Sequence, residues 1–144
     1  MYIEQISVYV QHRPGSGAAV TRVLGDHGVN ILGMSLADVD KYSIMHMIVD
    51  DPEKGFKVLK EAHFTLSSID VFAIQLGDAP GELSRVLEVL GGAGYNVEYA
   101  YGFSSRRTKE PVVIVRVDDV GGGSIELLQN AGFKLLSAEE VHVM

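Results

Sequence analysis

Cysteine is absent from the 144 residues of the chain. Its absence excludes disulfide bonds, thiolate metal sites and cysteine nucleophiles together. Basic residues are also few, because 12 Lys and Arg stand against 19 Asp and Glu and give a formal net charge of −7. Since phosphate contacts dominate the affinity of proteins for nucleic acids, this balance predicts that nucleic acid is not a partner.

The chain also lacks an apolar stretch of the length that a membrane span requires. Its start, MYIEQIS, has no basic segment followed by an apolar one, as a signal peptide would have. We therefore expect a cytoplasmic protein without membrane association. We also expect no metal site. None of four histidines has the spacing that would place it on one face of an element together with a carboxylate, as metal ligands require; these are His27, His46, His63 and His142.

What the chain does contain is a long internal duplication. Residues 8–31 and 74–97 follow one plan, and Pro80, Gly81 and Asn96 each lie 66 positions after Pro14, Gly15 and Asn30. Eight of the seventeen residues from 14 to 30 are identical in the second copy, where composition alone would give about one. An internal repeat of one structural unit is the economical interpretation.

Each copy begins as a strand and continues as a helix. Apolar side chains occupy alternate positions over residues 6–10 and 72–76, as a half-buried strand requires. After a Pro-Gly pair the apolar spacing changes to three and four, which is typical of an amphipathic helix. We place the proline at the first helical position, where its missing N–H costs nothing. Gly28 and Gly94 then predict left-handed caps at the helix ends.

The remaining residues of each copy complete the same unit. The patterns predict strands over residues 31–37, 42–49, 64–76, 111–117 and 133–143, and helices over residues 53–62 and 124–130. The order βαββαβ is the ferredoxin-like arrangement. The fold class is therefore α+β, with two tandem units. A unit of this size buries little surface alone, so the copies should pack on each other or on a partner chain.

Two motifs recur around the first helix of each copy. The first copy has HRPG at residues 12–15 and GVNI at 28–31, and the second has DAPG at 78–81 and GYNV at 94–97. In these motifs, and over nearly its whole length, the chain resembles tandem ACT-domain proteins, a regulatory family that senses amino acids. The resemblance implies two ACT units, residues 1–69 and 70–144, each an antiparallel sheet with helices on one face.

The resemblance also implies binding and not catalysis. ACT units typically hold a free amino acid where two units meet, between the loop that precedes the first helix of one unit and the second strand of its neighbour. A homodimer is expected, together with a partner such as a biosynthetic enzyme that the chain serves as a separate regulatory subunit. The candidate ligand-binding residues are His12, Arg13, Pro14, Gly15, Ser16, Asn30, Asp78, Ala79, Pro80, Gly81, Glu82, Leu83 and Asn96.

Elementary chemistry agrees with this assignment. Unpaired N–H groups after a Pro-Gly turn, at the positive end of a helix, suit an α-carboxylate. The amide of Asn30 or Asn96 offers both an acceptor and donors, so it suits an ammonium and a carboxylate edge. The polar residue two before the proline is His12 in one copy and Asp78 in the other. Because these side chains differ in charge, we expect two sites that are not equivalent.

Other interpretations stay open at this level. The Pro-Gly pairs and the two asparagines also fit purely structural roles in turns, in which case the chain is a dimerisation module without a ligand. Tyr99 and Tyr101 are more typical of the core than of a pocket. The basic residues Arg106, Arg107 and Lys109 fit a solvated loop tip.

Two enzyme or cofactor interpretations are disfavoured. The stretch GSGAAV at residues 15–20 imitates a dinucleotide-binding fingerprint, but Val20 stands at its third glycine position and the second copy keeps no such spacing. The glycines at 121–123 lack a following Lys-Ser/Thr, so they do not form a phosphate loop. No nucleophile with an adjacent base is visible. We therefore expect no cofactor and no catalysis.

Overall fold

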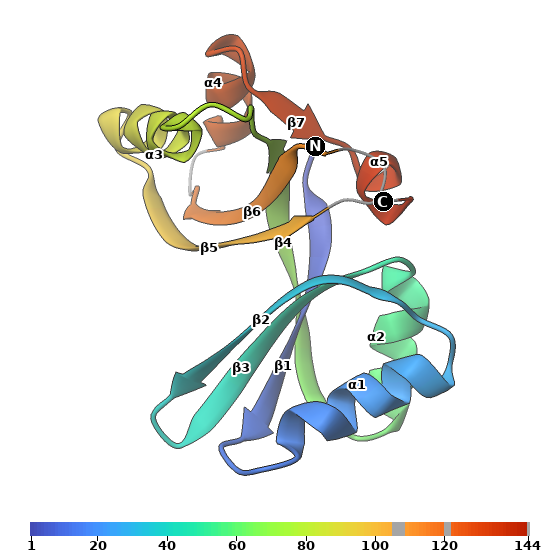
Figure 1. Cartoon of the computed structure of the whole chain (residues 1–144). Coiled ribbons are helices and arrows are strands. Elements are labelled where there is room, and N and C mark those ends of the chain that lie inside the picture. The colour runs from blue at the N-terminus through green and yellow to red at the C-terminus, as the bar shows by residue number, and fades with distance from the viewer. Residues whose placement is uncertain (105–108, 120–121, 144) are drawn as a thin grey trace. The chain divides into compact units, whose positions relative to one another are not determined.

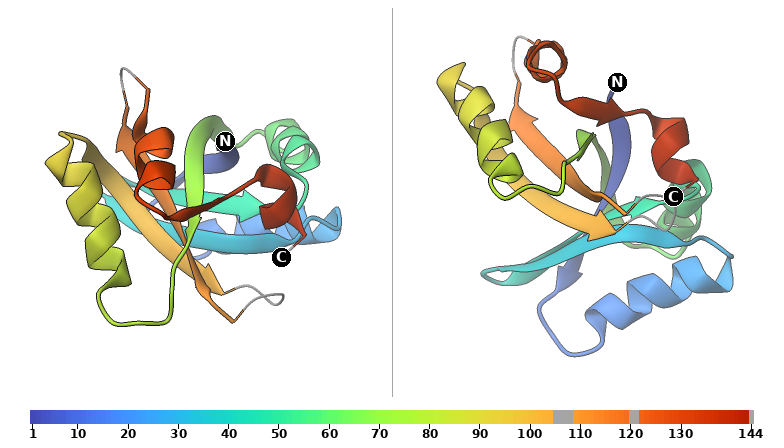
Figure 2. Two further views of the ribbon diagram at one scale, coloured as in Figure 1. Left: turned by 90° about the horizontal axis from the view of Figure 1, so that it is seen from above. Right: turned by 45° about the horizontal axis from the view of Figure 1, so that its top comes forward.

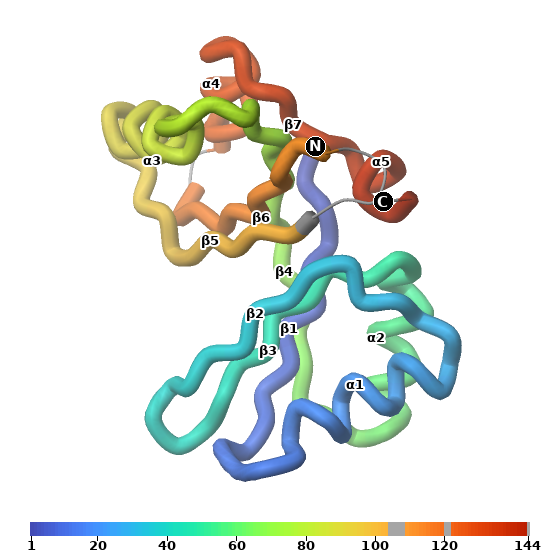
Figure 3. Tube along the Cα trace, viewed as in Figure 1, coloured from blue at the N-terminus to red at the C-terminus, as the bar shows by residue number. Residues whose placement is uncertain are grey.

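The structure is a computed structural model that describes residues 1–104, 109–119 and 122–143. The chain forms two compact units, and the first three residues belong with the second of them. We call Glu4–Ile69 the N-terminal unit, and Asp70–Met144 with Met1–Ile3 the C-terminal unit. Figure 1 and the Cα trace in Figure 3 follow the chain through both. Within the described ranges, no helix has the length and apolar character needed to cross a bilayer.

The N-terminal unit is one βαββαβ motif. Its elements are β1 (Ile3–Gln11), α1 (Ser16–Asp26), β2 (Ile31–Val39), β3 (Tyr42–Val49), α2 (Pro52–Glu61) and the first part of β4 (Thr65–Gln75). The strand order is β2-β3-β1-β4, and β3 pairs antiparallel with both of its neighbours. Helices α1 and α2 lie along one face of this sheet (Figure 1).

The alternating residues of β1 point to those helices and form the core of the unit. Ile6 and Val8 are fully buried against Val20 and Leu24 of α1 and Leu59 of α2. The strand and helix periods predicted from the sequence therefore meet in one cluster of side chains. Gly28 has a φ of 73°, as expected of a glycine that ends a helix.

The C-terminal unit repeats the motif. Its elements are the last part of β4, α3 (Glu82–Gly92), β5 (Asn96–Ser104), β6 (Pro111–Asp118), α4 (Ser124–Asn130), β7 (Lys134–Leu136) and α5 (Ala138–His142). Strand β6 pairs antiparallel with β5 and β4, and β7 pairs antiparallel with β4. Figure 2 shows α3 beside β5 in two further views. Val86 and Leu90 of α3 pack on Phe72 and Ile74 of β4. The α+β class with tandem ferredoxin-like units is confirmed.

The long final strand predicted over residues 133–143 is wrong. The strand ends at Leu136, and a short helix, α5, follows. Ser137 begins this helix with a capping box, because its hydroxyl accepts from the Glu140 N–H while Glu140 accepts from the Ser137 N–H, both at 3.1 Å. The pattern Ser-x-x-Glu is a helix start signal that outweighs the apolar residues around it.

The position of the two prolines is also corrected. Helix α1 begins at Ser16, with Gly15 as its N-cap, so Pro14 lies in the preceding turn and not in the helix. Gly15 has φ 88° and ψ −9°, and the Ser16 N–H donates to the Arg13 carbonyl at 3.3 Å. These values describe a type II turn with proline at its second and glycine at its third position. Pro80 precedes the N-cap of α3 in the same way.

Tyr99 and Tyr101 do not belong to the core of the C-terminal unit. The pairing of β5 with β6 shifts between Val97 and Tyr99, which marks an irregularity of the bulge type. One extra residue reverses which face the following side chains occupy. Ala100 is therefore paired with the buried Val115, and the two tyrosines lie on the opposite face, partly buried.

The two remaining segments singled out above lie only partly within the described residues. Arg106, Arg107 and Gly121 fall outside them, and Lys109 is exposed. At the other end of the glycine run, Gly123 caps α4 with a φ of 98°, and the Tyr95 hydroxyl donates to the Gly122 carbonyl at 2.9 Å. The protein's own groups thus engage this part of the loop.

Candidate functional site

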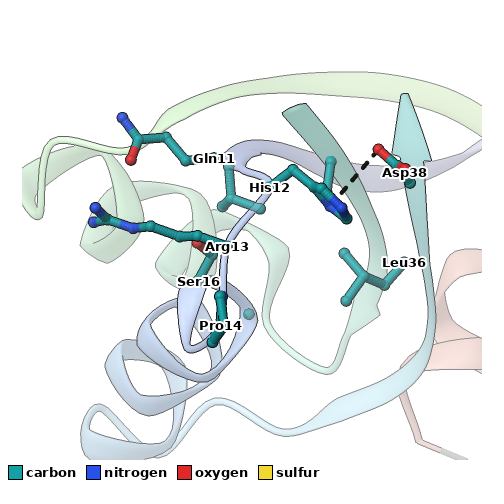
Figure 4. A pocket seen from close by; sticks show the side chains of 10 residues that line it. Gln11, His12, Arg13, Pro14, Ser16, Leu36 and Asp38 are labelled. Atoms are coloured by element: carbon teal, nitrogen blue, oxygen red, sulfur yellow. Dashed lines mark hydrogen bonds and ion pairs between the residues drawn. The ribbon is translucent and has the colours of Figure 1, made fainter. Parts of the chain in front are cut away.

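A cavity of about 520 Å³ opens in the N-terminal unit where β1 ends and α1 begins. The predicted residues His12, Arg13, Pro14 and Ser16 line it, and Gly15 stands between them in the chain. Figure 4 shows these side chains around the turn. The structure therefore brings the first block of candidate residues to one cavity. We call it the first cavity.

The backbone of the turn and of the first helical turn contributes polar groups to this site. The type II turn from Arg13 to Ser16 leads directly into α1, whose first intrahelical bond is donated by the Ala19 N–H to the Gly15 carbonyl at 3.1 Å. The N–H groups of the first helical turn have no partner within the helix. They carry the positive end of the helix dipole. This end of α1 is therefore suited to a small carboxylate.

His12 faces a carboxylate across the first cavity. Its Nδ1 lies 3.6 Å from Oδ1 of Asp38 on β2 and 3.2 Å from Oγ of Ser43 on β3. Figure 4 shows the His12 and Asp38 side chains pointing toward each other. Both remain more than half exposed, at 58% and 56%, so the pair itself contributes little stability. Asp38 is therefore accessible as a partner for a cationic group.

The other walls of the first cavity are apolar. Val10 of β1 and Leu36 of β2 line it beside Pro14. Gly17 keeps this wall close, because a Cβ at that position would lie 3.1 Å from Cε of Met45 and 3.6 Å from Cδ2 of Leu36. The cavity therefore joins a helix N terminus and a carboxylate to an apolar surface.

Asn30 lies apart from these residues. It follows α1, whereas the first cavity lies at the start of that helix. Its backbone N–H donates to Oδ1 of Asp50 and its carbonyl accepts from the Asp50 N–H, both at 3.0 Å. Within its own unit, Asn30 does not line the cavity. A contact of Asn30 with a ligand stays a prediction about a neighbouring unit.

The equivalent turn of the C-terminal unit carries different side chains. Glu82 stands where the first copy has Ser16, and its carboxylate folds over Gly77, since a Cβ on Gly77 would lie 3.5 Å from Cδ and Oε2 of Glu82. Oε2 also pairs with Arg85 at 3.2 Å, and the Glu82 side chain is only 23% exposed. A carboxylate of the protein thus lies beside this turn.

The other candidates of the second copy are distributed around this turn and one strand. Ala79, Pro80 and Gly81 lie in the turn and Asp78 precedes it, with Gly81 as the N-cap of α3 at a φ of 91°. Leu83 is 43% exposed on α3. Asn96 begins β5 opposite Asp118 and is, like Asn30, at the far end of the helix.

Sequence reasoning missed the two partners of His12 in the first cavity, Asp38 and Ser43. It placed Asp38 in a hairpin connection, but β2 extends to Val39 and pairs Asp38 with Ser43. Ser43 pairs in turn with Val10 of β1. Knowledge of the pairing register of β1, β2 and β3 would have located both, because this register places Val10, Ser43 and Asp38 side by side on neighbouring strands. No group of three or more His, Asp or Glu positioned to hold a metal ion occurs among the residues described.

Solved structures with the same fold match most or all of the chain. A protein from Bacteroides thetaiotaomicron is 30% identical in sequence, with a TM-score of 0.90, over 100% of this chain and 98% of that one. The regulatory subunit of aspartate kinase from Thermus thermophilus is 14% identical, with a TM-score of 0.60, over 89% of this chain and 91% of that one. The second likeness shows the fold alone.

Sequence comparison gives the family directly. No curated protein matches the sequence. The sequence profile of the ACT domain pair, however, matches residues 1–140, which is nearly the entire chain. Both copies of the repeat lie within this match. The two βαββαβ units, the duplicated Pro-Gly turns and the profile agree, and the chain belongs to the family of ACT domain pairs.

Proposed function

We propose that this protein is a non-catalytic regulatory protein that binds a free amino acid in the first cavity. The observation that carries the proposal is the pairing of opposite charges across that cavity. The N terminus of α1 suits the α-carboxylate of the ligand, because N–H groups without a partner in the helix and the helix dipole favour an anion there. Asp38 suits the α-ammonium group, and Ser43 and His12 are neighbours of the same position.

The apolar wall of the first cavity receives the remainder of the ligand. Val10 and Leu36 line it, and Leu36 is 52% exposed without a ligand. Covering such a side chain removes apolar surface from water and adds to affinity. A cavity of about 520 Å³ has room for any common amino acid.

Membership of the family and the structural neighbours support a role exerted through a second protein. The chain resembles in fold the regulatory subunits of aspartate kinase. We infer that it regulates an amino-acid biosynthetic enzyme as a separate subunit, and that it does so as a cytoplasmic homodimer. Under this proposal Asn30, Asn96 and the turn of the second copy contact a ligand only where units from neighbouring copies meet.

A thermal-shift screen with the twenty common L-amino acids tests the proposal. A specific ligand at a hundred times its dissociation constant stabilises the folded protein by about 2.7 kcal/mol. The substitution Asp38→Asn removes the charge that faces the ammonium group and weakens binding about fivefold, since a unit charge at about 4 Å in water contributes ~1 kcal/mol.

The matched control is Asp26→Asn, which removes an exposed carboxylate at the far end of α1. This variant keeps the affinity of the unmodified protein. Absence of a shift with every amino acid at millimolar concentration contradicts the proposal. A shift that is equally sensitive to both substitutions would show that net charge, and not the first cavity, determines binding.

A further inference from the structure

A second cavity of about 310 Å³ lies beside the first in the N-terminal unit. The two cavities share Arg13 and Ser16, and the second is bounded on its other side by His63 and Thr65, between α2 and β4. Two cationic or potentially cationic side chains therefore line it. No Asp or Glu is among the described residues that surround it.

Arg13 is oriented toward the second cavity. Figure 4 shows its side chain pointing away from the His12 and Asp38 pair, on the opposite side of the turn. Among the residues that the structure describes, the ion pairs involve His12, Arg85 and Arg116, and none includes Arg13. Its guanidinium has five N–H donors in a planar fork, the geometry that matches a carboxylate or a phosphate.

His63 reaches this cavity through an unusual backbone conformation. Its φ is 67°, in the left-handed region, immediately after α2. There its N–H donates to the Lys60 carbonyl at 3.0 Å, and the following N–H of Phe64 donates to the Leu59 carbonyl at 3.2 Å. This ending of a helix favours glycine, because only glycine adopts it without strain.

The second copy has the residue that this backbone favours. Gly132 has a φ of 91° after α4, and the Phe133 N–H donates to the Leu128 carbonyl at 3.1 Å, as in the first copy. Ala79 likewise stands where the first copy has Arg13. The repeat thus forms the same backbone without either cationic side chain. Neither side chain is required by the fold.

We propose that the second cavity binds an anionic group, a carboxylate or a phosphate, through Arg13 and His63. Ser16 and Thr65 supply hydroxyl donors at its rim. With a formal net charge of −7, the chain as a whole repels anions. A local site is therefore needed to hold one.

Two sources of this anion fit the geometry. One is the side-chain carboxylate of an acidic amino acid whose α-ammonium group lies at Asp38, since the two cavities are adjacent and share Arg13 and Ser16 as lining residues. This source rests on the proposed function. The other source is a small free anion, which binds whether or not an amino acid occupies the first cavity.

Isothermal titration of the full chain with L-glutamate, L-glutamine and sodium phosphate, at constant pH and ionic strength, tests the inference. The variants are Arg13→Ala and His63→Gly, and the second suits the backbone because glycine adopts a φ of 67° without strain. Arg22→Ala is the matched control, as it removes an exposed arginine from α1, the helix that follows Arg13.

We expect each of the two variants to weaken binding of the anionic probe by at least about fivefold, because hydrogen bonds to charged groups are the stronger ones. Arg22→Ala leaves it unchanged. A preference for L-glutamate over L-glutamine that both variants abolish identifies the acidic amino acid as the source. Phosphate binding that both variants weaken, without a preference between the two amino acids, identifies the free anion.

The outcomes separate this inference from the proposed function. Equal affinity for L-glutamate and L-glutamine, together with no phosphate binding, overturns the inference while leaving amino-acid binding intact. Phosphate binding that Arg13→Ala and His63→Gly both weaken, without a response to any amino acid in the thermal-shift screen, supports the inference and overturns the proposed function. Anion binding that Arg22→Ala weakens as much as Arg13→Ala also overturns the inference, because the effect is then one of net charge.

Discussion

Gly15 and Gly81 hold nearly the same backbone conformation, with φ of 88° and 91°, but the side chains around the two turns differ in charge. The first turn carries Arg13 and Ser16 beside an open cavity. The second carries Ala79, and Glu82 folded over Gly77. The duplication has therefore preserved the turn as a structural device while its surroundings have diverged.

The comparison shows which residues the turn requires and which can vary without changing its backbone. The proline, the left-handed glycine and the buried helix residues are present in both copies and belong to the fold. The charges differ between the copies, so the fold does not depend on them. Under the proposed function, the ligand therefore binds in the N-terminal unit. The carboxylate of Glu82 then weakens binding at the second turn.

The shared scaffold is tested by truncating the same core residue in each unit. Leu24 and Leu90 are both fully buried at the end of their helices. Leu24→Ala and Leu90→Ala should each lower the free energy of unfolding by about 3 kcal/mol, the combined cost of lost burial and the cavity left behind. Urea denaturation followed by circular dichroism measures both. A loss below about 1 kcal/mol in either variant would mean that its unit relaxes around the cavity.

The turn itself is tested by Gly15→Ala and Gly81→Ala. No atom lies within 4 Å of an added Cβ at either position, so only the left-handed backbone opposes the substitution. Each should cost about 1–2 kcal/mol of stability. Gly25→Ala and Gly91→Ala are matched controls inside the same helices, also with open space. The two control variants should stabilise the protein by about 0.5–1 kcal/mol. If the turn variants and the control variants change stability in the same direction, the interpretation is contradicted.

The divergent residue is tested by exchanging it between the copies. Ser16→Glu places a carboxylate beside the first turn and should weaken binding of the ligand found in the amino-acid screen about fivefold, as expected of a like charge at about 4 Å in water. Glu82→Ser should strengthen any binding at the second turn by a similar factor. Titration calorimetry measures both, with Glu88→Ser as a control on the exposed face of α3. If neither Ser16→Glu nor Glu82→Ser changes the affinity, the carboxylate of Glu82 does not influence ligand binding.

Much of the fold could be predicted from sequence, because period and turn chemistry are local properties. Strand β3 and helix α4 lie at the residues expected, 42–49 and 124–130. The end of the chain was missed for an equally local reason, the capping box at Ser137, which competes with an apolar strand pattern. The faces of Tyr99 and Tyr101 were missed because a bulge reverses the alternation without any clear sign in composition.

The candidate site was only partly predictable. The repeat itself indicates residues 12–16, because both copies keep a Pro-Gly turn at the same spacing. Asp38 and Ser43 depend on which strands pair and in which register, and His63 depends on the end of α2 lying beside β1. Such positions are set by tertiary packing. A sequence pattern contains them only after the sheet order is known.

The type II turn before α1 has a consequence for the free energy of binding. Its backbone is held by a proline, by a glycine in a conformation that suits it, and by a hydrogen bond from Ser16 to Arg13. An arriving molecule therefore meets a loop that needs no ordering, and the entropic penalty of association falls mainly on the ligand and a few side chains. A compound with few atoms makes few contacts, so under the proposed function a preformed turn leaves more of the energy of those contacts to appear as affinity.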